Sequence, residues 1–244
     1  MVLVEGDAEN ILLPVFAKCL GRSFTEYGVS VVNVGSRGLF RYGRIFQRND
    51  GQLAPVKVAC VADRDITPDA AKAYAPKTQR QVANNLPKYE SELIAAQKIE
   101  TQIASIKKYD GGVVKTFVSE KWTLEHDIAL AGYGEEMHVA ICFAKKLSNA
   151  VKELNGEERK EVFREAKAEY QEWAKTESKQ SLAARVYEPL YEKEVSKALT
   201  AQIFAAIIIS KKQSPLGICK SLPPYLVAAI EYVTEALPAP KADA

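Results

Sequence analysis

The sequence has few of the residues that build zinc sites, disulfides or membrane spans. Its four cysteines are scattered, with no CxxC pair, and it has only two histidines. The cysteines are Cys19, Cys60, Cys142 and Cys219. They are typical of reduced thiols in a cytoplasmic protein, and His126 and His138 are too few and too unsupported to predict zinc. No apolar run approaches the roughly 18–20 residues that span a bilayer, and no secretory leader is recognisable. We therefore expect a cytoplasmic protein with no membrane partner.

The composition is ordinary for a globular protein. The 244 residues are 47% hydrophobic and 26% charged, enough for one large domain or two small ones. The formal net charge of +2 neither requires nor excludes nucleic acid, because a basic stripe can be hidden in a balanced total.

Apolar runs alternate with helical patterns in the first half of the chain. Four runs read as strands: Val2–Gly6, Val29–Gly38, Val56–Asp65 and Val113–Glu120. Alternation of strands and helices favours a mainly parallel α/β sheet, and nearly continuous apolar strands favour a sheet covered on both faces.

The remaining segments are predicted to be helical. One helical pattern runs from Leu86 to Lys108, and a helix opened by Thr123 is ended by Gly132. Residues 135–210 carry no strand signal and indicate three or four helices. A last helix is expected over Ser214–Tyr232.

Acidic residues follow three of the predicted strands. They are Glu5 and Glu9 after the first, Asp63 and Asp65 after the third, and Glu125 and Asp127 in the helix after the fourth. Because the carboxyl ends of parallel strands meet at one sheet edge, we expect these carboxylates to converge. Clustered carboxylates repel unless they are protonated or bridged by a cation, and oxygen-only ligands suit Mg²⁺ or Mn²⁺. The pattern predicts a divalent metal site.

The same motifs carry a resemblance to a known family. "LVEGDAENILLPVFAKCLG", "VNVGSRG", "VACVADRD" and "WTLEHDIA", in this order, resemble the TOPRIM nuclease domain of OLD (overcoming lysogenisation defect) family endonucleases. The resemblance covers about 130 residues and is weaker in the later helices. It implies a TOPRIM-like fold with an additional helical domain, and a site that binds two divalent ions, Mg²⁺ or Mn²⁺, and cuts DNA. The implied metal ligands are Glu5, Glu9, Asp63, Asp65 and Glu125.

The resemblance also implies a larger protein. An ATPase domain normally precedes this nuclease region, and the chain has no G-x-x-x-x-G-K-[ST] motif. Because a strand follows Met1 at once, we expect an excised piece of an ATPase–nuclease, and a homodimer of the full-length protein stays open. The expected divisions are a nuclease core over 1–134, a helical region over 135–200, a C-terminal part of the core over 201–234 and a disordered tail over 235–244.

A catalytic lysine near the end of the domain is a further implication. "IISKKQSPLG" offers Lys211 and Lys212, with Lys211 favoured. Together with the acids Glu5 and Asp63, they are the candidate catalytic residues. Pro215 interrupts the expected pattern, so the spacing leaves both lysines open. Asp127 is an alternative or an aid to Glu125.

Two ions can clamp the attacking and leaving oxygens of a phosphodiester, with Asp63 as the candidate bridge. In "GSRG", Ser36 between two glycines lets the backbone approach a phosphate, or simply makes a tight turn. Arg37, Arg41 and Arg44 are candidates to line the DNA path. Arg64, between two acids, is expected to point away from them and to pair with a neighbouring acid.

Other functions remain open at this stage. A receiver-like module would use Asp63 as a phosphate acceptor and Lys115 as its partner, but Gly6 stands where a receiver carries an acid. A TOPRIM domain can also serve a topoisomerase, which needs a strand-transfer tyrosine, or a primase. The density of acids argues against a scaffold without catalysis.

Overall fold

The structure is a computed structural model that describes residues 1–36, 38–47, 52, 54–150 and 153–235. The expected disordered tail therefore lies almost wholly outside the described residues.

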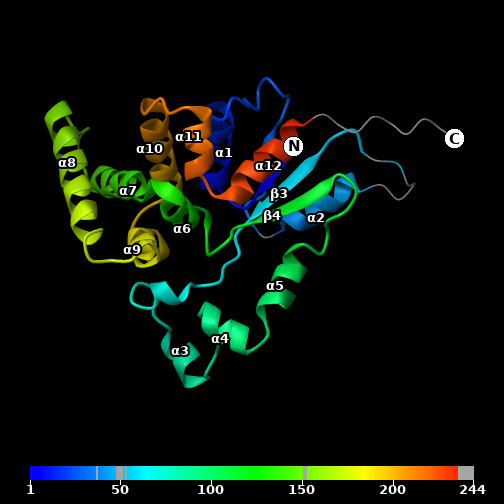
Figure 1. Ribbon diagram of the computed structural model, residues 1–244, viewed down its shortest axis with the longest axis horizontal. Helices are drawn as coiled ribbons and strands as arrows, with labels where there is room; N and C mark the ends of the chain where they lie inside the picture. The colour runs from blue at the N-terminus through cyan, green and yellow to red at the C-terminus, as the bar shows by residue number, and fades with distance from the viewer. Residues whose placement is uncertain (37, 48–51, 53, 151–152, 236–244) are drawn as a thin grey trace.

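Four parallel strands form one sheet in the order β2-β1-β3-β4 (Figure 1). Their bounds are β1 Val2–Val4, β2 Val31–Asn33, β3 Val58–Ala62 and β4 Val114–Val118. Each corresponds to a predicted apolar run, so the parallel α/β class is confirmed. Val4 pairs with Asn33 on one side and Val61 on the other, which brings the carboxyl ends of these strands to one edge.

Helices make up most of the rest of the chain. They are α1 Asp7–Cys19, α2 Leu39–Gly43, α3 Gln79–Ala83, α4 Glu90–Ala95, α5 Ile99–Ile106, α6 Leu124–Ile128, α7 Gly134–Asn149, α8 Gly156–Trp173, α9 Lys179–Tyr191, α10 Lys197–Ser210, α11 Pro215–Ser221 and α12 Pro224–Thr234. A π-helical segment, Ala129–Tyr133, joins α6 to α7, and short 3-10 turns occupy Arg44–Phe46 and Asp69–Ala71. The described residues between 135 and 210 hold four helices, α7 to α10, and the sequence predicted three or four.

Both faces of the sheet are buried along its two central strands, β1 and β3, as expected for parallel strands. Every residue of β3 is buried, and its side chains alternate between two hydrophobic clusters. Ala59 and Val61 face the larger cluster, while Val58, Cys60 and Ala62 face the smaller one, which includes Leu39 of α2.

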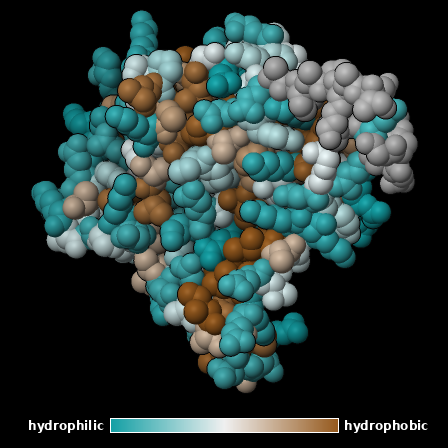
Figure 2. Space-filling view, turned by 45° about the vertical axis from the view of Figure 1, so that its right-hand side comes forward, coloured by the Kyte–Doolittle hydropathy of each residue, from teal (hydrophilic) through white to brown (hydrophobic). Residues whose placement is uncertain are grey.

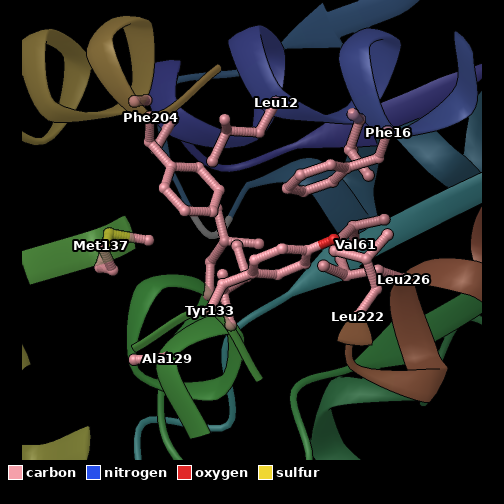
Figure 3. Packing of buried hydrophobic residues seen from close by; sticks show 14 of the residues in the cluster. Leu12, Phe16, Val61, Ala129, Tyr133, Met137, Phe204, Leu222 and Leu226 are labelled. Carbon is pink, nitrogen blue, oxygen red and sulfur yellow. The ribbon is translucent and has the colours of Figure 1, made fainter. Parts of the chain in front are cut away.

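The larger cluster is continuous from the sheet into the helical part of the chain. Figure 3 shows Leu12 and Phe16 of α1 packed near Phe204 of α10 and Tyr133 of the π segment. The Phe204 ring meets the rings of Phe16 and Tyr133 edge-on, with centroids 6.4 and 5.9 Å apart. Burying a large apolar side chain contributes about 1.5–3 kcal/mol, so α10 is held firmly against α1. The expected division of the chain into core and helical region stays a prediction.

Two predicted helices are broken in the structure. The pattern from Leu86 to Lys108 forms two short helices, α4 and α5, because Gln97 between them has φ 54°. The last helix, expected over Ser214–Tyr232, is split into α11 and α12 at Leu222. Proline disfavours the helical conformation in the residue before it, so Pro223 ends α11.

Helices α3, α4 and α5 form a lobe that projects below the sheet (Figure 1). Hydrophobic residues gather on this lobe in Figure 2, and its exposed large apolar side chains include Val82, Leu86 and Ile94. None of the helices in the described part of the chain has the length and apolar character to cross a bilayer.

Candidate metal centre

The first pair of acids stands at the end of β1. Glu5 follows the strand, and Glu9 lies in the first turn of α1 with only 7% of its surface exposed. Gly6 between them caps the helix in an extended conformation, and a Cβ at Gly6 would lie 3.2 Å from Glu9 Oε2. The glycine therefore leaves room for the Glu9 carboxylate at the sheet edge.

Asp63 joins the end of β3 to the start of α6. Its Oδ1 accepts a hydrogen bond from the backbone N–H of Leu124 at 2.9 Å. The Thr123 side chain caps α6. Glu125 lies in the first turn of this helix and is only 4% exposed. The cap fixes the helix start, and the bond to Leu124 fixes Asp63, so both carboxylates have defined positions.

A lysine from the first turn of α10 completes the cluster. Lys197 follows the helix cap Ser196, and its Nζ lies 3.0 Å from Glu125 Oε2. The same ammonium lies 5.4 Å from the centroid of the Tyr187 ring. The sequence did not predict Lys197 as a site residue, because it follows no strand. A serine that can cap a helix, followed by a lysine in its first turn, was the one feature that could have indicated it.

These groups surround one cavity of about 400 Å³. Its lining is Glu5, Gly6, Asp7, Ala8, Glu9, Asp63, Glu125, Ser196, Lys197 and Ala198. Four of the six predicted metal ligands are thus brought together from three strand ends.

Crowding of carboxylates shifts their protonation. Burial, and then the charge of Glu125, raises the pKa of Glu9. Burial, then the charges of Glu9 and Glu125, raises the pKa of Asp63. Burial alone would lower the pKa of the Lys197 ammonium, but Glu125, Tyr187 and Asp63 raise it. The site carries excess negative charge that one lysine only partly offsets.

The donor set fits a hard divalent cation. The side-chain donors of the cavity wall are oxygens, apart from the Lys197 ammonium, and oxygen ligands suit Mg²⁺ or Mn²⁺. Among the described residues, no three of these carboxylate oxygens lie within 4.8 Å of one another. Ion binding would therefore draw the side chains inward across the cavity.

Asp65 was also predicted as a ligand, but its side chain does not line the cavity as that of Asp63 does. Its φ of 55° ends the extended backbone, and its side chain is exposed. The expectation that both side chains share one face assumed that the strand continued, but β3 ends at Ala62. Asp65 is not among the described residues that line the cavity.

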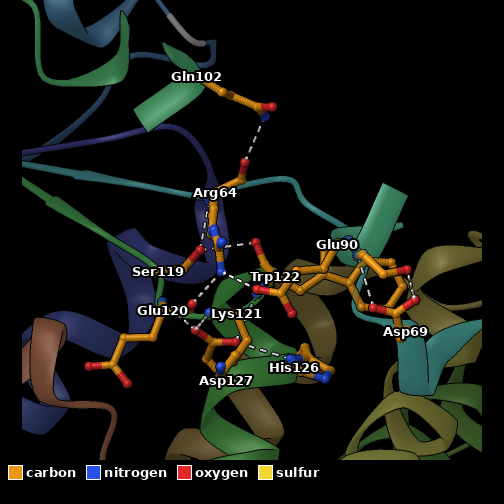
Figure 4. Close-up of polar contacts among 11 residues, drawn as sticks. Arg64, Asp69, Glu90, Gln102, Ser119, Glu120, Lys121, Trp122, His126 and Asp127 are labelled. Carbon is orange, nitrogen blue, oxygen red and sulfur yellow. Dashed lines mark hydrogen bonds and ion pairs between the residues drawn. The ribbon is translucent and has the colours of Figure 1, made fainter. Parts of the chain in front are cut away.

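Asp127, the sixth predicted ligand, binds backbone instead. Its Oδ2 accepts hydrogen bonds from the N–H groups of Glu120 and Lys121 at 2.7 and 3.0 Å (Figure 4). Its Oδ1 accepts one from Trp122 N at 3.1 Å and lies 3.0 Å from His126 Nδ1. The carboxylate holds the turn between β4 and α6, and the structure does not bring it into the cavity.

Arg64 has the structural role that the sequence predicted. Its Nη1 donates to Glu90 Oε1 at 3.1 Å and to the Glu120 carbonyl at 2.8 Å (Figure 4). Its backbone N–H donates to Ser119 Oγ at 2.6 Å. The expected pairing with a neighbouring acid is confirmed, and the side chain ties the projecting lobe to the end of β4.

The two lysines favoured from the sequence lie at the far end of α10. Lys211 pairs with Glu136 of α7, and Lys212, with φ 48°, is exposed beyond the helix. At 1.5 Å per residue, the 14 residues from Lys197 to Lys211 span roughly 20 Å. Neither lysine lines the cavity.

The predicted phosphate contacts follow β2, beside β1 at the same sheet edge. Ser36 and Arg41 are exposed, and Ser36 Oγ accepts a hydrogen bond from Gly38 N at 3.1 Å. Asn33 Nδ2 donates to Asp7 Oδ1 at 2.7 Å, which ties this loop to the start of α1. Arg37 lies outside the described residues.

Two buried side chains stand behind the cluster. His126 is 1% exposed and packs against Trp122, with ring centroids 5.5 Å apart. The Tyr225 hydroxyl is buried without a hydrogen-bond partner among the described residues. Burial, and then the charges of Asp127 and Asp63, raises its pKa.

Comparison with known proteins supports a TOPRIM nuclease-type domain. Residues 1–65 match the family model described as "Overcoming lysogenization defect protein-like, TOPRIM domain". No curated protein matches the chain in sequence.

Solved structures extend the similarity over the whole fold. The C-terminal region of the Burkholderia pseudomallei OLD protein is 20% identical, with a TM-score of 0.52, over 96% of this chain and 95% of that one. The C-terminal region of the Xanthomonas campestris pv. campestris OLD protein is 22% identical, with a TM-score of 0.51, over 96% of this chain and 90% of that one. The resemblance to the OLD family that the four motifs indicated is confirmed, by the family model over residues 1–65 and by the fold over the rest.

Proposed function

We propose that this chain is the nuclease part of a larger protein and hydrolyses phosphodiester bonds in DNA with two divalent ions. The observation that carries the proposal is the cavity where Glu5, Glu9, Asp63 and Glu125 meet Lys197 at the carboxyl edge of a parallel sheet. Four carboxylates and one cation match the demands of Mg²⁺ or Mn²⁺ bound to a phosphate.

The four cavity carboxylates would hold the ions. Asp63 is the candidate to bridge both, because it follows β3, which pairs with β1 ahead of Glu5 and Glu9, and is held by the N–H of Leu124 beside Glu125. Asp65 remains a candidate ligand from outside the present cavity wall.

Bound ions would supply an activated water and stabilise the departing oxygen. The water oxygen forms a bond to phosphorus, the bond from phosphorus to the leaving 3′ oxygen breaks, and that oxygen takes up a proton. The Lys197 ammonium is placed to neutralise charge that builds on the remaining phosphate oxygens. This role replaces the one first predicted for Lys211 or Lys212.

DNA would reach the cavity along the sheet edge. Ser36, Arg37 and Arg41 follow β2, the strand next to β1, and are the proposed backbone contacts, with Arg44 beyond them. The exposure of Ser36 and Arg41 supports this placement. We further propose an N-terminal ATPase domain and DNA as partners, a homodimer of the full-length protein, and a cytoplasmic location.

Two alternatives have less support. In a receiver module Lys115 would reach Asp63, but Lys115 pairs with Ala59 at the start of β3 and its Nζ lies over the Phe117 ring. In a topoisomerase a tyrosine would attack the DNA. Tyr225, whose pKa is raised by burial and then by the charges of Asp127 and Asp63, is only 7% exposed.

A plasmid assay tests the proposal. Supercoiled DNA is incubated with the chain and Mg²⁺, Mn²⁺ or Ca²⁺, and nicked and linear products are counted for wild type, Asp63→Ala and the control Lys212→Ala. We expect cleavage with Mg²⁺ or Mn²⁺, loss in Asp63→Ala and no change in Lys212→Ala. Cleavage that survives Asp63→Ala would refute the mechanism, and covalent protein–DNA adducts would favour the topoisomerase alternative.

A further inference from the structure

A second group of ligand atoms lies between α7 and α8, away from the acidic cavity. His138 and Cys142 stand one turn apart on α7, and Glu169 faces them from α8. The His138 Nε2 lies 3.0 Å from Glu169 Oε2 and 3.5 Å from Cys142 Sγ. One ligand atom from each residue falls within 4.8 Å of the other two, and in the described part of the chain no other trio does so.

The two helices are held at this spacing by close packing. In Figure 1, α8 stands at the left edge of the molecule, and α7 runs inward from it toward α6. Gly134 on α7 lies against the Tyr170 ring of α8, and a Cβ there would require the ring to shift. The Trp173 ring meets the His138 ring edge-on at 4.6 Å between centroids. The imidazole is 7% exposed and therefore has a fixed direction.

The contacts exclude a catalytic triad. A Cys-His-Glu triad uses both ring nitrogens, one toward the nucleophile and the other toward the acid. Here the thiol and the carboxylate both approach the same nitrogen, Nε2. Three ligand atoms that converge on one point are the arrangement of a metal site.

The two distances from His138 Nε2 are close to those around a tetrahedral ion. With Zn–N of about 2.0 Å, Zn–S of about 2.3 Å and Zn–O of about 2.0 Å, tetrahedral angles give N···S of about 3.5 Å and N···O of roughly 3.3 Å. The distances at His138 are 3.5 and 3.0 Å. Nitrogen, sulfur and carboxylate ligands together select a borderline transition metal over Mg²⁺ or Ca²⁺.

We propose that His138, Cys142 and Glu169 form a second metal site, which takes Zn²⁺ or a similar divalent transition ion. The Cys142 thiol loses its proton to solvent as the sulfur binds. Glu169 is 52% exposed at its side chain, so water can fill the fourth position. The ion clips α8 to α7. Because this site exists only in the folded chain, binding stabilises the packed α7–α8 pair by mass action.

Cobalt is the probe, because a Co²⁺–thiolate bond absorbs in the near ultraviolet and a carboxylate site does not. The full chain, reduced and with saturating Mg²⁺ to occupy the acidic cavity, is titrated with Co²⁺ and then with Zn²⁺. We expect one equivalent of Co²⁺ to give the thiolate band and Zn²⁺ to remove it. Cys142→Ser should abolish the band, and the control Cys219→Ser, at an exposed cysteine, should keep it.

Glu169→Gln is a second test that does not depend on a buried residue. Because Glu169 is on the surface, this substitution should leave the fold intact. Since even outer-shell partners cost about 10–100-fold in affinity, loss of a direct ligand should weaken Co²⁺ binding by about a hundredfold or more. Wild type should also gain thermal stability with Zn²⁺, and Glu169→Gln should gain less. Absence of a thiolate band in wild type, or a band that persists in Cys142→Ser, would overturn the proposal. Unchanged Co²⁺ affinity in Glu169→Gln would do so too.

Discussion

Lys197 and Glu125 form an ion pair of 3.0 Å across 72 residues of sequence. The Glu125 carboxylate is buried, whereas the lysine side chain is 43% exposed. The pair therefore joins a fixed charge inside the cluster to a cation that still reaches solvent and can turn toward a phosphate.

Replacing Lys197 by alanine should separate ion binding from cleavage. Without the ammonium the acidic cavity is more negative, so Mn²⁺ affinity should stay the same or rise. Cleavage should fall by roughly a hundredfold or more, the cost of one lost transition-state contact. Calorimetric titration with Mn²⁺ and plasmid nicking rates measure the two effects.

Lys211→Ala is the matched control for this experiment. It removes a lysine from the other end of the same helix, where the partner is Glu136. Nicking by Lys211→Ala should remain close to wild type. A loss equal to that of Lys197→Ala would restore the lysine first predicted from the sequence.

Asp63→Asn should make the ion-free protein more stable. The amide oxygen can still accept the hydrogen bond from Leu124 N, and the buried charge is gone. A gain of about 1 kcal/mol would raise the Tm by roughly 2–4 °C for a chain of this size. Thermal unfolding in EDTA measures it, and the same variant should lose most of its Mn²⁺-dependent rise in Tm. A variant less stable than wild type in EDTA would contradict this account.

Stability without ions should fall as the pH rises. Burial and neighbouring acids raise the pKa values of Glu9 and Asp63 in the folded protein. Between about pH 4, where unfolded carboxyls ionise, and these raised values, the folded state holds more protons than the unfolded state. The contribution of these two carboxyl groups to the free energy of unfolding is thus fully present below about pH 4. It is lost as the pH rises through their pKa values in the folded protein.

Metal binding should show the opposite trend. Because Mn²⁺ must displace these protons, its affinity should increase over the same pH interval. Titrations at several pH values, with Glu9→Gln and Asp63→Asn for comparison, test both trends. A pH-independent Mn²⁺ affinity would argue that the carboxylates are already ionised.

Asp127→Ala should destabilise the fold whether or not ions are bound. It leaves the N–H groups of Glu120, Lys121 and Trp122 without their acceptor, at a cost of about 2–4 kcal/mol. Asp127→Asn should recover part of this loss, because its amide oxygen still accepts. Denaturant unfolding with and without Mn²⁺ gives the comparison, and a loss seen only with Mn²⁺ would mean that Asp127 is a ligand.

The sequence predicted the sheet and its acidic edge well for a physical reason. Apolar runs that end in acids mark the carboxyl ends of parallel strands, and the topology then brings Glu5, Glu9 and Asp63 together. Glu125 could be placed because its helix follows directly on β4. These features depend on local pattern and on one general rule of α/β sheets.

Features set by distant packing could not be predicted. Lys197 reaches the cavity because Phe204 and its neighbours dock α10 against α1, which no local pattern records. Asp65 does not line the cavity, because its own backbone is left-handed and turns away from the direction of the strand. The approach of Glu169 to His138 depends on the packing of α8 against α7, where Trp173 meets His138 and Tyr170 meets Gly134.

The position of Lys197 late in the chain also bears on when the acidic cavity can be completed. The acids come from the first 125 residues, but the lysine is residue 197 of 244, and its helix docks on α1 from the start of the chain. Contacts between such distant segments form late, because the intervening loop must first be closed. During synthesis the acidic cavity would therefore stay without its cation until most of the chain had left the ribosome. Under the proposed mechanism, a growing chain could not yet cleave DNA.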